Sequence, residues 1–156
     1  MSNPTPDALH DAMGRQLFAQ LEALPGSRRL KPEQLEVIYS LAYAHVVQNQ
    51  HAQALPIFAF LVQYGPTRRH YLAGLALCLH AAGRFDEAVN MHSLALVLFP
   101  EHLEPALHMA ESLAAKGDID AARHLLKQVA ATDTPELSAR AATLLERLAR
   151  REEATT

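Results

Sequence analysis

The stretch AAGRFDEAVNMHSLALVLFP, residues 81–100, carries an evenly spaced set of small and structure-breaking residues. Gly83 is followed by an aromatic residue two positions later, then by Ala88 and finally by Pro100. The same set returns when the sequence is shifted by 34 residues in either direction. Under this shift the matching positions are Ala54, Ala122, Gly117 and Pro66. A fixed period of this length predicts a fold built from repeated structural units.

A 34-residue period with this pattern resembles the tetratricopeptide repeat, a pair of antiparallel helices. Three copies fit the chain, at about residues 35–68, 69–102 and 103–136. Small residues recur where the helices would cross, because a larger side chain would force the helix axes apart. These positions are Ala42, Ala54, Ala76, Ala88, Ala110 and Ala122. Leu41, which the period aligns with Leu75, is expected in the core between helices.

The turn between the two helices of each repeat is predicted at Asn49, Gly83 and Gly117. Glycine adopts the left-handed backbone conformation without a steric penalty, and asparagine is the next best residue for it. Pro100 is expected to end a second helix, because proline cannot continue one. Pro56 lies near the start of another second helix and is tolerable only within its first turn.

We expect one all-α domain, residues 1–156, that forms a tetratricopeptide-repeat solenoid. A helical segment at residues 7–30 precedes the three helix pairs at residues 35–136. A capping helix at residues 137–151 is expected to follow them, because the last repeat would otherwise expose its apolar face. The apolar side of this helix consists of Leu137, Ala141, Leu144, Leu145 and Leu148.

The N-terminal segment has an apolar stripe of its own, with residues at helical spacing. The stripe consists of Leu9, Met13, Leu17, Leu21 and Leu24. Part of it has no obvious partner within the segment. We therefore predict that it packs on the first repeat or on a second copy of the chain, which would give a weak homodimer. The predicted interface consists of Met13, Leu17, Phe18 and Leu21.

The composition narrows the class of protein. The net charge is −3 and the pI is about 6.3, which leaves no basic surface for nucleic acid. No apolar run approaches the roughly 20 residues that a membrane span needs, and the N-terminus lacks the pattern of a secretory signal. The single cysteine indicates a reducing compartment. We expect the protein in the cytoplasm.

No residue pattern in the sequence indicates an enzyme. Among nine histidines, His108 stands one helical turn from Glu111. No second pair has the spacing of a metal site, and the HExxH pattern is absent. Cys78 lies between Leu77 and Leu79 without a neighbouring cation, which is typical of a small core residue rather than a nucleophile. We predict no catalytic residue, no metal and no cofactor.

A stack of helix pairs has a concave groove, lined mainly by the first helix of each repeat. The inward-facing positions known for this repeat fold are Glu36, Tyr39, Tyr43, Val46, Val47, His70, Ala73, Leu77, His80, Ala81, Glu104, Leu107, Glu111, Ala114 and Ala115. None is a lysine or arginine, so a groove that clamps a C-terminal carboxylate is not expected, because a buried carboxylate must be paired. An apolar groove with tyrosines suits an extended peptide with apolar side chains. The alternative is that Leu107 and Ala73 only pack within the solenoid.

Three strings carry a more specific resemblance, namely LEVIYSLAY (35–43), GRFDEAV (83–89) and LHMAESLAAKGDIDAA (107–122). They resemble the class II chaperones of bacterial type III secretion, the LcrH/SycD-like group. The first string matches the family's pattern Leu-Tyr-Ser-Leu-Ala-aromatic, with Ile38 in place of its leucine. The third string has Ser112 in place of the family's cysteine.

The resemblance implies a non-enzymatic cytoplasmic chaperone that keeps two hydrophobic translocator proteins soluble and apart before secretion. In that family the groove takes an extended translocator segment with spaced proline and leucine anchors. The groove contacts carried over by position are Tyr39, Tyr43, Leu72, Leu77 and His108. Together with the inward-facing positions, the predicted groove site comprises Tyr39, Tyr43, Val46, Val47, Leu72, Leu77, His80, Leu107, His108 and Glu111. The alternative function is a general scaffold that joins two proteins.

Overall fold

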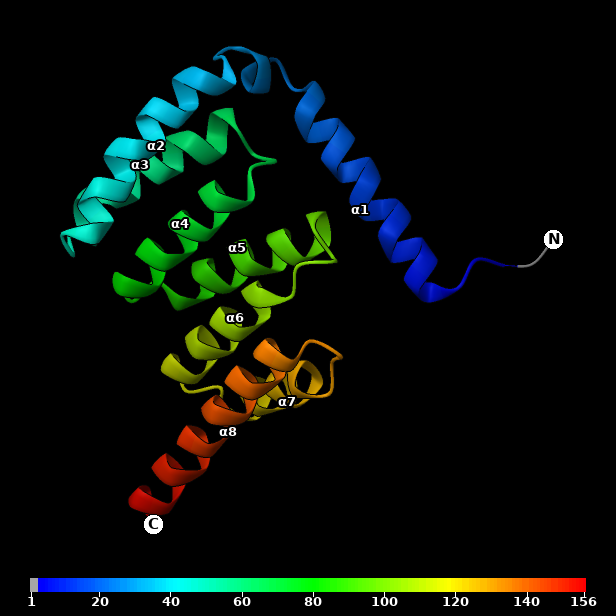
Figure 1. The fold of residues 1–156 in the computed structure, drawn as a ribbon, viewed down its shortest axis with the longest axis vertical. Coiled ribbons are helices and arrows are strands. Elements are labelled where there is room, and N and C mark those ends of the chain that lie inside the picture. The colour runs from blue at the N-terminus through cyan, green and yellow to red at the C-terminus, as the bar shows by residue number, and fades with distance from the viewer. Residues whose placement is uncertain (1–2) are drawn as a thin grey trace.

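The computed structural model describes residues 3–156, and within them it contains eight α-helices, one 3₁₀ helix and no strand. The elements are α1 (Pro6–Ala23), η1 (Pro25–Arg28), α2 (Pro32–Val47), α3 (His51–Tyr64), α4 (Arg69–Ala81), α5 (Phe85–Leu98), α6 (Glu104–Ala115), α7 (Ile119–Ala130) and α8 (Pro135–Thr155). Helices α2 to α7 form three antiparallel pairs that stack into a curved solenoid (Figure 1). The predicted all-α solenoid, with an N-terminal helix and a C-terminal capping helix, is confirmed. Positions 1 and 2 of the predicted domain lie outside the described residues.

The same turn closes all three helix pairs. Asn49, Gly83 and Gly117 have φ angles of 60°, 74° and 99°, so all three predicted left-handed positions are confirmed. Gly83 donates its N–H to the carbonyl of His80 at 3.0 Å, and the residue after it donates to the carbonyl of Leu79 at 2.9 Å. These two bonds define the Schellman motif, and the same pair of bonds recurs at the other two turns. A repeated sequence signal therefore produces a repeated backbone geometry.

The core follows the alanine pattern of the repeats. All six alanines predicted at the helix crossings are at most 1% exposed. They are Ala42, Ala54, Ala76, Ala88, Ala110 and Ala122. Their small side chains allow close approach of the helices, and larger residues such as Phe58 and Leu61 fill the space beside them.

The prediction that Leu41 lies in the core is wrong. Its side chain is 55% exposed, whereas Leu75, one period later, is 9% exposed. In a stack of repeats, the face of α4 that carries Leu75 is covered by the preceding helix pair. No pair precedes α2, so the corresponding face, which carries Val37 and Leu41, stays uncovered.

Helix α1 packs on the second repeat rather than beside α2. Gly14 makes the close approach, since a Cβ atom there would lie only 2.4 Å from the carbonyl oxygen of Val97 on α5. The apolar residues that follow Gly14 join a cluster with α4 and α5. This cluster contains Leu17, Phe18, Leu21, Leu72, Leu98 and Phe99.

Three of the four residues predicted for the dimer interface therefore have partners within their own chain. Leu17, Phe18 and Leu21 are half-buried in a cluster that draws most of its residues from the second repeat and one, Val62, from the first. Their role in a dimer stays a prediction. Met13 is 59% exposed. The periodicity of the sequence identified the apolar stripe, but it could not predict the direction in which α1 runs relative to the solenoid.

Pro56 lies further into its helix than predicted. It is the sixth residue of α3, beyond the first turn, and the helix continues through it to Tyr64. Its missing N–H leaves the carbonyl of Ala52 without its helical donor. Both residues are exposed, so water can satisfy that carbonyl.

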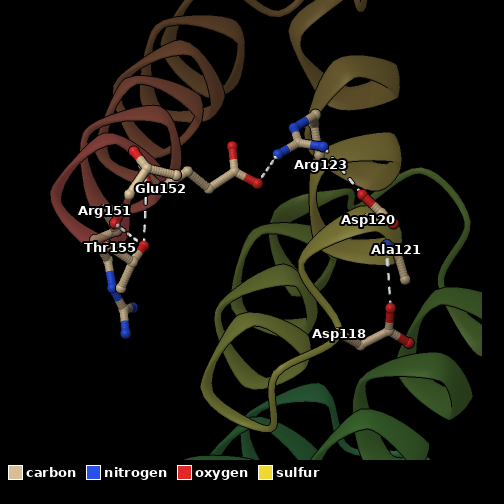
Figure 2. A network of polar contacts seen from close by, with 8 residues as sticks. Asp118, Asp120, Ala121, Arg123, Arg151, Glu152 and Thr155 are labelled. Atoms are coloured by element: carbon tan, nitrogen blue, oxygen red, sulfur yellow. Dashed lines mark hydrogen bonds and ion pairs between the residues drawn. The ribbon is translucent and has the colours of Figure 1, made fainter.

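The capping helix α8 closes the C-terminal end of the solenoid. Ala141 and Leu148 are buried against α6 and α7, and α8 extends beyond the predicted 137–151 at both ends. On the surface, Arg123 of α7 pairs with Asp120 at 3.1 Å and also with Glu152 of α8 (Figure 2). Exposed ion pairs of this kind contribute little stability, so apolar burial holds the cap in place.

None of the helices within residues 3–156 combines the length and apolarity that a bilayer span requires.

Candidate functional site

The first helices of the three pairs, α2, α4 and α6, surround a central hollow with a volume of about 470 Å³. Helices α3 and α5 contribute residues to its floor. This size is typical of binding sites in proteins. The hollow is lined by Tyr39, Tyr43, Val46, Phe58, Arg69, His70, Ala73, Gly74, Ala76, Leu77, His80, His92, Ala95, Glu104, Pro105, His108, Glu111 and Ser112.

One end of the hollow is an aromatic wall. The ring of Tyr39 lies 4.7 Å from His70, 5.8 Å from Tyr71 and 6.0 Å from Phe58, measured between ring centroids. Burial raises the pKa of Tyr39, which keeps its hydroxyl neutral and able to donate. Tyr43 stands one turn further along α2 and is 55% exposed. Tyr39 is thus part of the packed wall, whereas Tyr43 offers its ring to the hollow.

Glu36 holds this wall in position. Its Oε1 accepts a hydrogen bond from the hydroxyl of Tyr71 at 2.7 Å and lies 2.7 Å from Nε2 of His70. The bond from Tyr71 is the main reason that the pKa of Glu36 is lowered, and the contact with His70 adds to it against the opposing effect of burial. Because α2 supplies Glu36 and α4 supplies both partners, the contacts tie the first two repeats together.

The other end of the hollow is a row of three histidines from three successive helices. Nδ1 of His80 is 2.8 Å from the hydroxyl of Ser112, and Nδ1 of His108 is 3.3 Å from Oε2 of Glu111. His92 stacks on His108 with centroids 5.9 Å apart. Burial, and then the neighbouring imidazoles, lower the pKa of His92 to about 4. His92 is therefore neutral at pH 7.

Charged groups line the mouth of the hollow. Glu104 pairs with Arg140 at 3.0 Å, and this bond is the main cause of its lowered pKa. The contact with His108 likewise lowers the pKa of Glu111. Arg69 also lines the hollow, so the expectation of a lining without cations is wrong. A single arginine among two carboxylates does not make a carboxylate clamp.

Seven of the ten predicted groove residues line the hollow, namely Tyr39, Tyr43, Val46, Leu77, His80, His108 and Glu111. Val47 is 67% exposed and lies outside the lining. Leu72 and Leu107 are each 1% exposed, and their placement in the groove is wrong. Leu72 belongs to the cluster that α1 covers, and Leu107 belongs to the cluster that α8 covers.

The floor residues Phe58, His92 and Ala95 were not predicted, because only the first helix of each repeat was expected to face inward. The sequence did contain a signal for one of them. The 34-residue period places His92 in register with Phe58 and Leu126, which are both 2% exposed. A polar residue at a position that is apolar in the other two repeats marks a special role.

The possible metal ligands and the cysteine are placed as follows. Within residues 3–156, no three histidine, cysteine, aspartate or glutamate side chains are grouped as metal ligands. Cys78 is buried, and burial raises the pKa of its thiol to about 11. A protonated thiol in the core is not a nucleophile.

Comparison with known proteins identifies the repeats and the family. Two tetratricopeptide-repeat family models match residues 39–91 and 79–148. The low calcium response locus protein H of Yersinia pseudotuberculosis is 28% identical over 122 residues, which cover 75% of this chain and 73% of that protein. The type III secretion translocator chaperone SycD of Yersinia enterocolitica, solved with a peptide of the translocator YopD, is 26% identical. Its TM-score is 0.69, and the match covers 80% of this chain and 99% of SycD. In sequence and in fold the chain is similar to the tetratricopeptide-repeat chaperones of type III secretion.

A second solved member of this chaperone family supports the same placement. PcrH, a protein of Pseudomonas aeruginosa, was solved in complex with the chaperone-binding region of PopD and is 26% identical to this chain. The match has a TM-score of 0.70 and covers 80% of this chain and 98% of PcrH. The family resemblance of the strings at 35–43, 83–89 and 107–122 is thereby confirmed.

Proposed function

We propose that this protein is a chaperone that binds an extended, apolar segment of a type III translocator in the central hollow. Bound in this way, hydrophobic translocators would stay soluble and apart in the bacterial cytoplasm until they are secreted. The role requires binding and release but no chemical step, so we propose no enzymatic activity. A general scaffold that joins two folded proteins is the less specific alternative.

The observation that carries this proposal is the apolar lining of the hollow. Tyr43 and Leu77 face it with 55% and 46% of their surfaces exposed. Large apolar side chains that stay in water within a concave surface mark a binding site. Proline and leucine anchors of an extended segment would cover them, while the tyrosine hydroxyl bonds to the main chain of the segment.

The test is co-expression of the full chain with a candidate translocator, followed by measurement of how much translocator is soluble. Tyr43→Ala is expected to weaken binding by about 1–3 kcal/mol, roughly 5- to 150-fold, with little loss of stability. Tyr39→Ala is expected to reduce both binding and stability, because the Tyr39 ring packs on four others.

Phe60→Ala is the matched control, because Phe60 is an aromatic residue that is 38% exposed and lies outside the hollow. If Tyr43→Ala and Phe60→Ala bind the translocator equally well, the hollow is not the binding site. If no translocator becomes more soluble in the presence of the wild-type chain, the chaperone role itself is refuted.

We also propose self-association through the uncovered face of α2. One structure of SycD is described as an alternative dimer. In this chain, Val37 and Leu41 are 72% and 55% exposed on the face that a preceding repeat would cover. Leu41→Glu is expected to lower the mass measured by light scattering, whereas Leu77→Glu, at an exposed leucine elsewhere, is expected to leave it unchanged. An unchanged mass for Leu41→Glu would remove this face from any dimer.

A further inference from the structure

His92 is a buried polar side chain with no partner of its own. It is 5% exposed, and it lines the floor of the central hollow. Within residues 3–156, no hydrogen bond engages either of its ring nitrogens, yet no fully buried polar atom lacks a partner. Its nitrogens therefore keep some accessible surface, and the residue lines the hollow.

The neighbouring polar groups are already engaged. His80 and Ser112 contact each other, and His108 contacts Glu111. His92 stacks on His108 but forms no hydrogen bond with it. The nitrogens of His92 therefore have only the water of the hollow as a partner, and a ligand that displaces this water must replace its hydrogen bonds. The other two repeats avoid the problem by placing Phe58 and Leu126 at this position.

We propose, as an extension of the proposed function, that His92 is a recognition residue that forms a hydrogen bond with an amide group of the bound segment. A neutral imidazole has one N–H donor and one acceptor nitrogen, and an amide has the same complement. The lining also contains the small side chains of Ala73, Ala76 and Ala95, which leave room for a peptide main chain.

The surroundings disfavour charged ligands. A carboxylate would enter a hollow that already contains Glu104 and Glu111. A cation would need a free carboxylate, but Glu104 is paired with Arg140 and Glu111 contacts His108, while Arg69 adds repulsion. A neutral amide avoids both penalties. It comes either from the main chain of the segment or from an asparagine or glutamine side chain.

The test uses the full chain and overlapping peptides that tile YopD and PopD, with affinity measured by fluorescence anisotropy. The tightest peptide is then varied by N-methylation of each main-chain amide and by replacement of each asparagine or glutamine with leucine. With the wild-type chain, one change is expected to weaken binding by roughly threefold to tenfold. An N-methyl position identifies the main chain as the source, and a side-chain replacement identifies asparagine or glutamine.

Two variants of His92 complete the test. His92→Phe, which copies the first repeat, is expected to melt higher by about 2 °C, because it replaces a mostly buried polar ring with an apolar one. It is also expected to bind roughly threefold to tenfold more weakly and to become insensitive to the peptide change that the wild-type chain detects. His92→Gln retains a neutral donor and acceptor and is expected to keep most of the affinity. His124→Phe, at an exposed histidine outside the hollow, is the control.

Each remaining outcome overturns the inference. If His92→Phe binds as tightly as wild type, or stays sensitive to every peptide change, His92 recognises no amide while the proposed function stands. If His92→Gln loses as much affinity as His92→Phe, the imidazole acts by shape alone. If the wild-type chain binds none of the peptides, the proposed function and the inference both fall.

Discussion

Acidification from pH 7 to pH 5 is expected to lower the free energy of unfolding through the single buried imidazole of His92. In the folded state, burial and the neighbouring histidines lower the pKa of His92 to about 4, against an ordinary value of 6.5. Above pH 6.5 neither state binds the proton, so the full stability is present. Between pH 6.5 and pH 4 only the unfolded state binds it, and stability is lost as the pH falls.

The size of this effect follows from linkage between proton binding and folding. One proton bound only by the unfolded state costs about 1.4 kcal/mol per pH unit, which gives about 2 kcal/mol by pH 5 and about 3 kcal/mol by pH 4. The lowered pKa values of Glu36, Glu104 and Glu111 add losses of the same sign, but only below their ordinary value of 4.5. Between pH 7 and pH 5, the change in stability therefore reports the titration of histidine and not that of the carboxylates.

Urea denaturation followed by circular dichroism measures the effect directly. The wild-type chain and His92→Phe are compared at several pH values, with His124→Phe as the control. The stability of His92→Phe is expected to fall by about 2 kcal/mol less than that of the wild type between pH 7 and pH 5. Parallel curves of stability against pH for these two proteins would refute the claim that His92 is neutral and buried.

Two further comparisons test the packing. Gly83→Ala is expected to cost about 1 kcal/mol from the left-handed backbone alone, since no atom lies within 4 Å of the added Cβ. Gly74→Ala is expected to cost about 1–3 kcal/mol for a different reason, because its Cβ would lie 2.1 Å from the ring of Phe58; equal melting of Gly74→Ala and wild type would contradict this contact. Leu75→Ala is expected to cost about 2–5 kcal/mol and Leu41→Ala less than about 1 kcal/mol, as measured by urea denaturation; similar costs would mean that the face of α2 is covered in solution.

The fold was predictable because the repeat pattern is local and redundant. Each turn needs one residue with a left-handed backbone, and each helix crossing needs one small residue, so a fixed period reveals both. The exposure of Leu41 and the packing of the α1 stripe on the second repeat were missed for a shared reason. Periodicity describes a unit with neighbours on both sides, and it does not say which element covers the end of the stack.

The candidate site was less predictable, because a hollow depends on the relative positions of all three repeats. The expectation of inward-facing first helices placed Tyr43 and Leu77 correctly but missed the floor. Leu72 was carried over from a resemblance in sequence, whereas the orientation of its side chain depends on where α1 packs. The sequence shows His92 as a polar residue at a position that is apolar in the other two repeats. Only the structure shows that this polar residue is buried and lines the hollow.

The position of α1 has a mechanical consequence. Most contacts in the solenoid join helices that are adjacent in sequence, as in the coils of a spring. Helix α1 instead reaches past α2, α3 and α4 to press Gly14 against α5, and so acts as a strut across the first two coils (Figure 1). A bend of the solenoid that separates the first two helix pairs must also move α5 along α1. The junction between the second and third pairs is made mainly by α5 and α6, without a strut of this kind. We therefore expect the histidine end of the hollow, which spans that junction, to deform more easily than the tyrosine end.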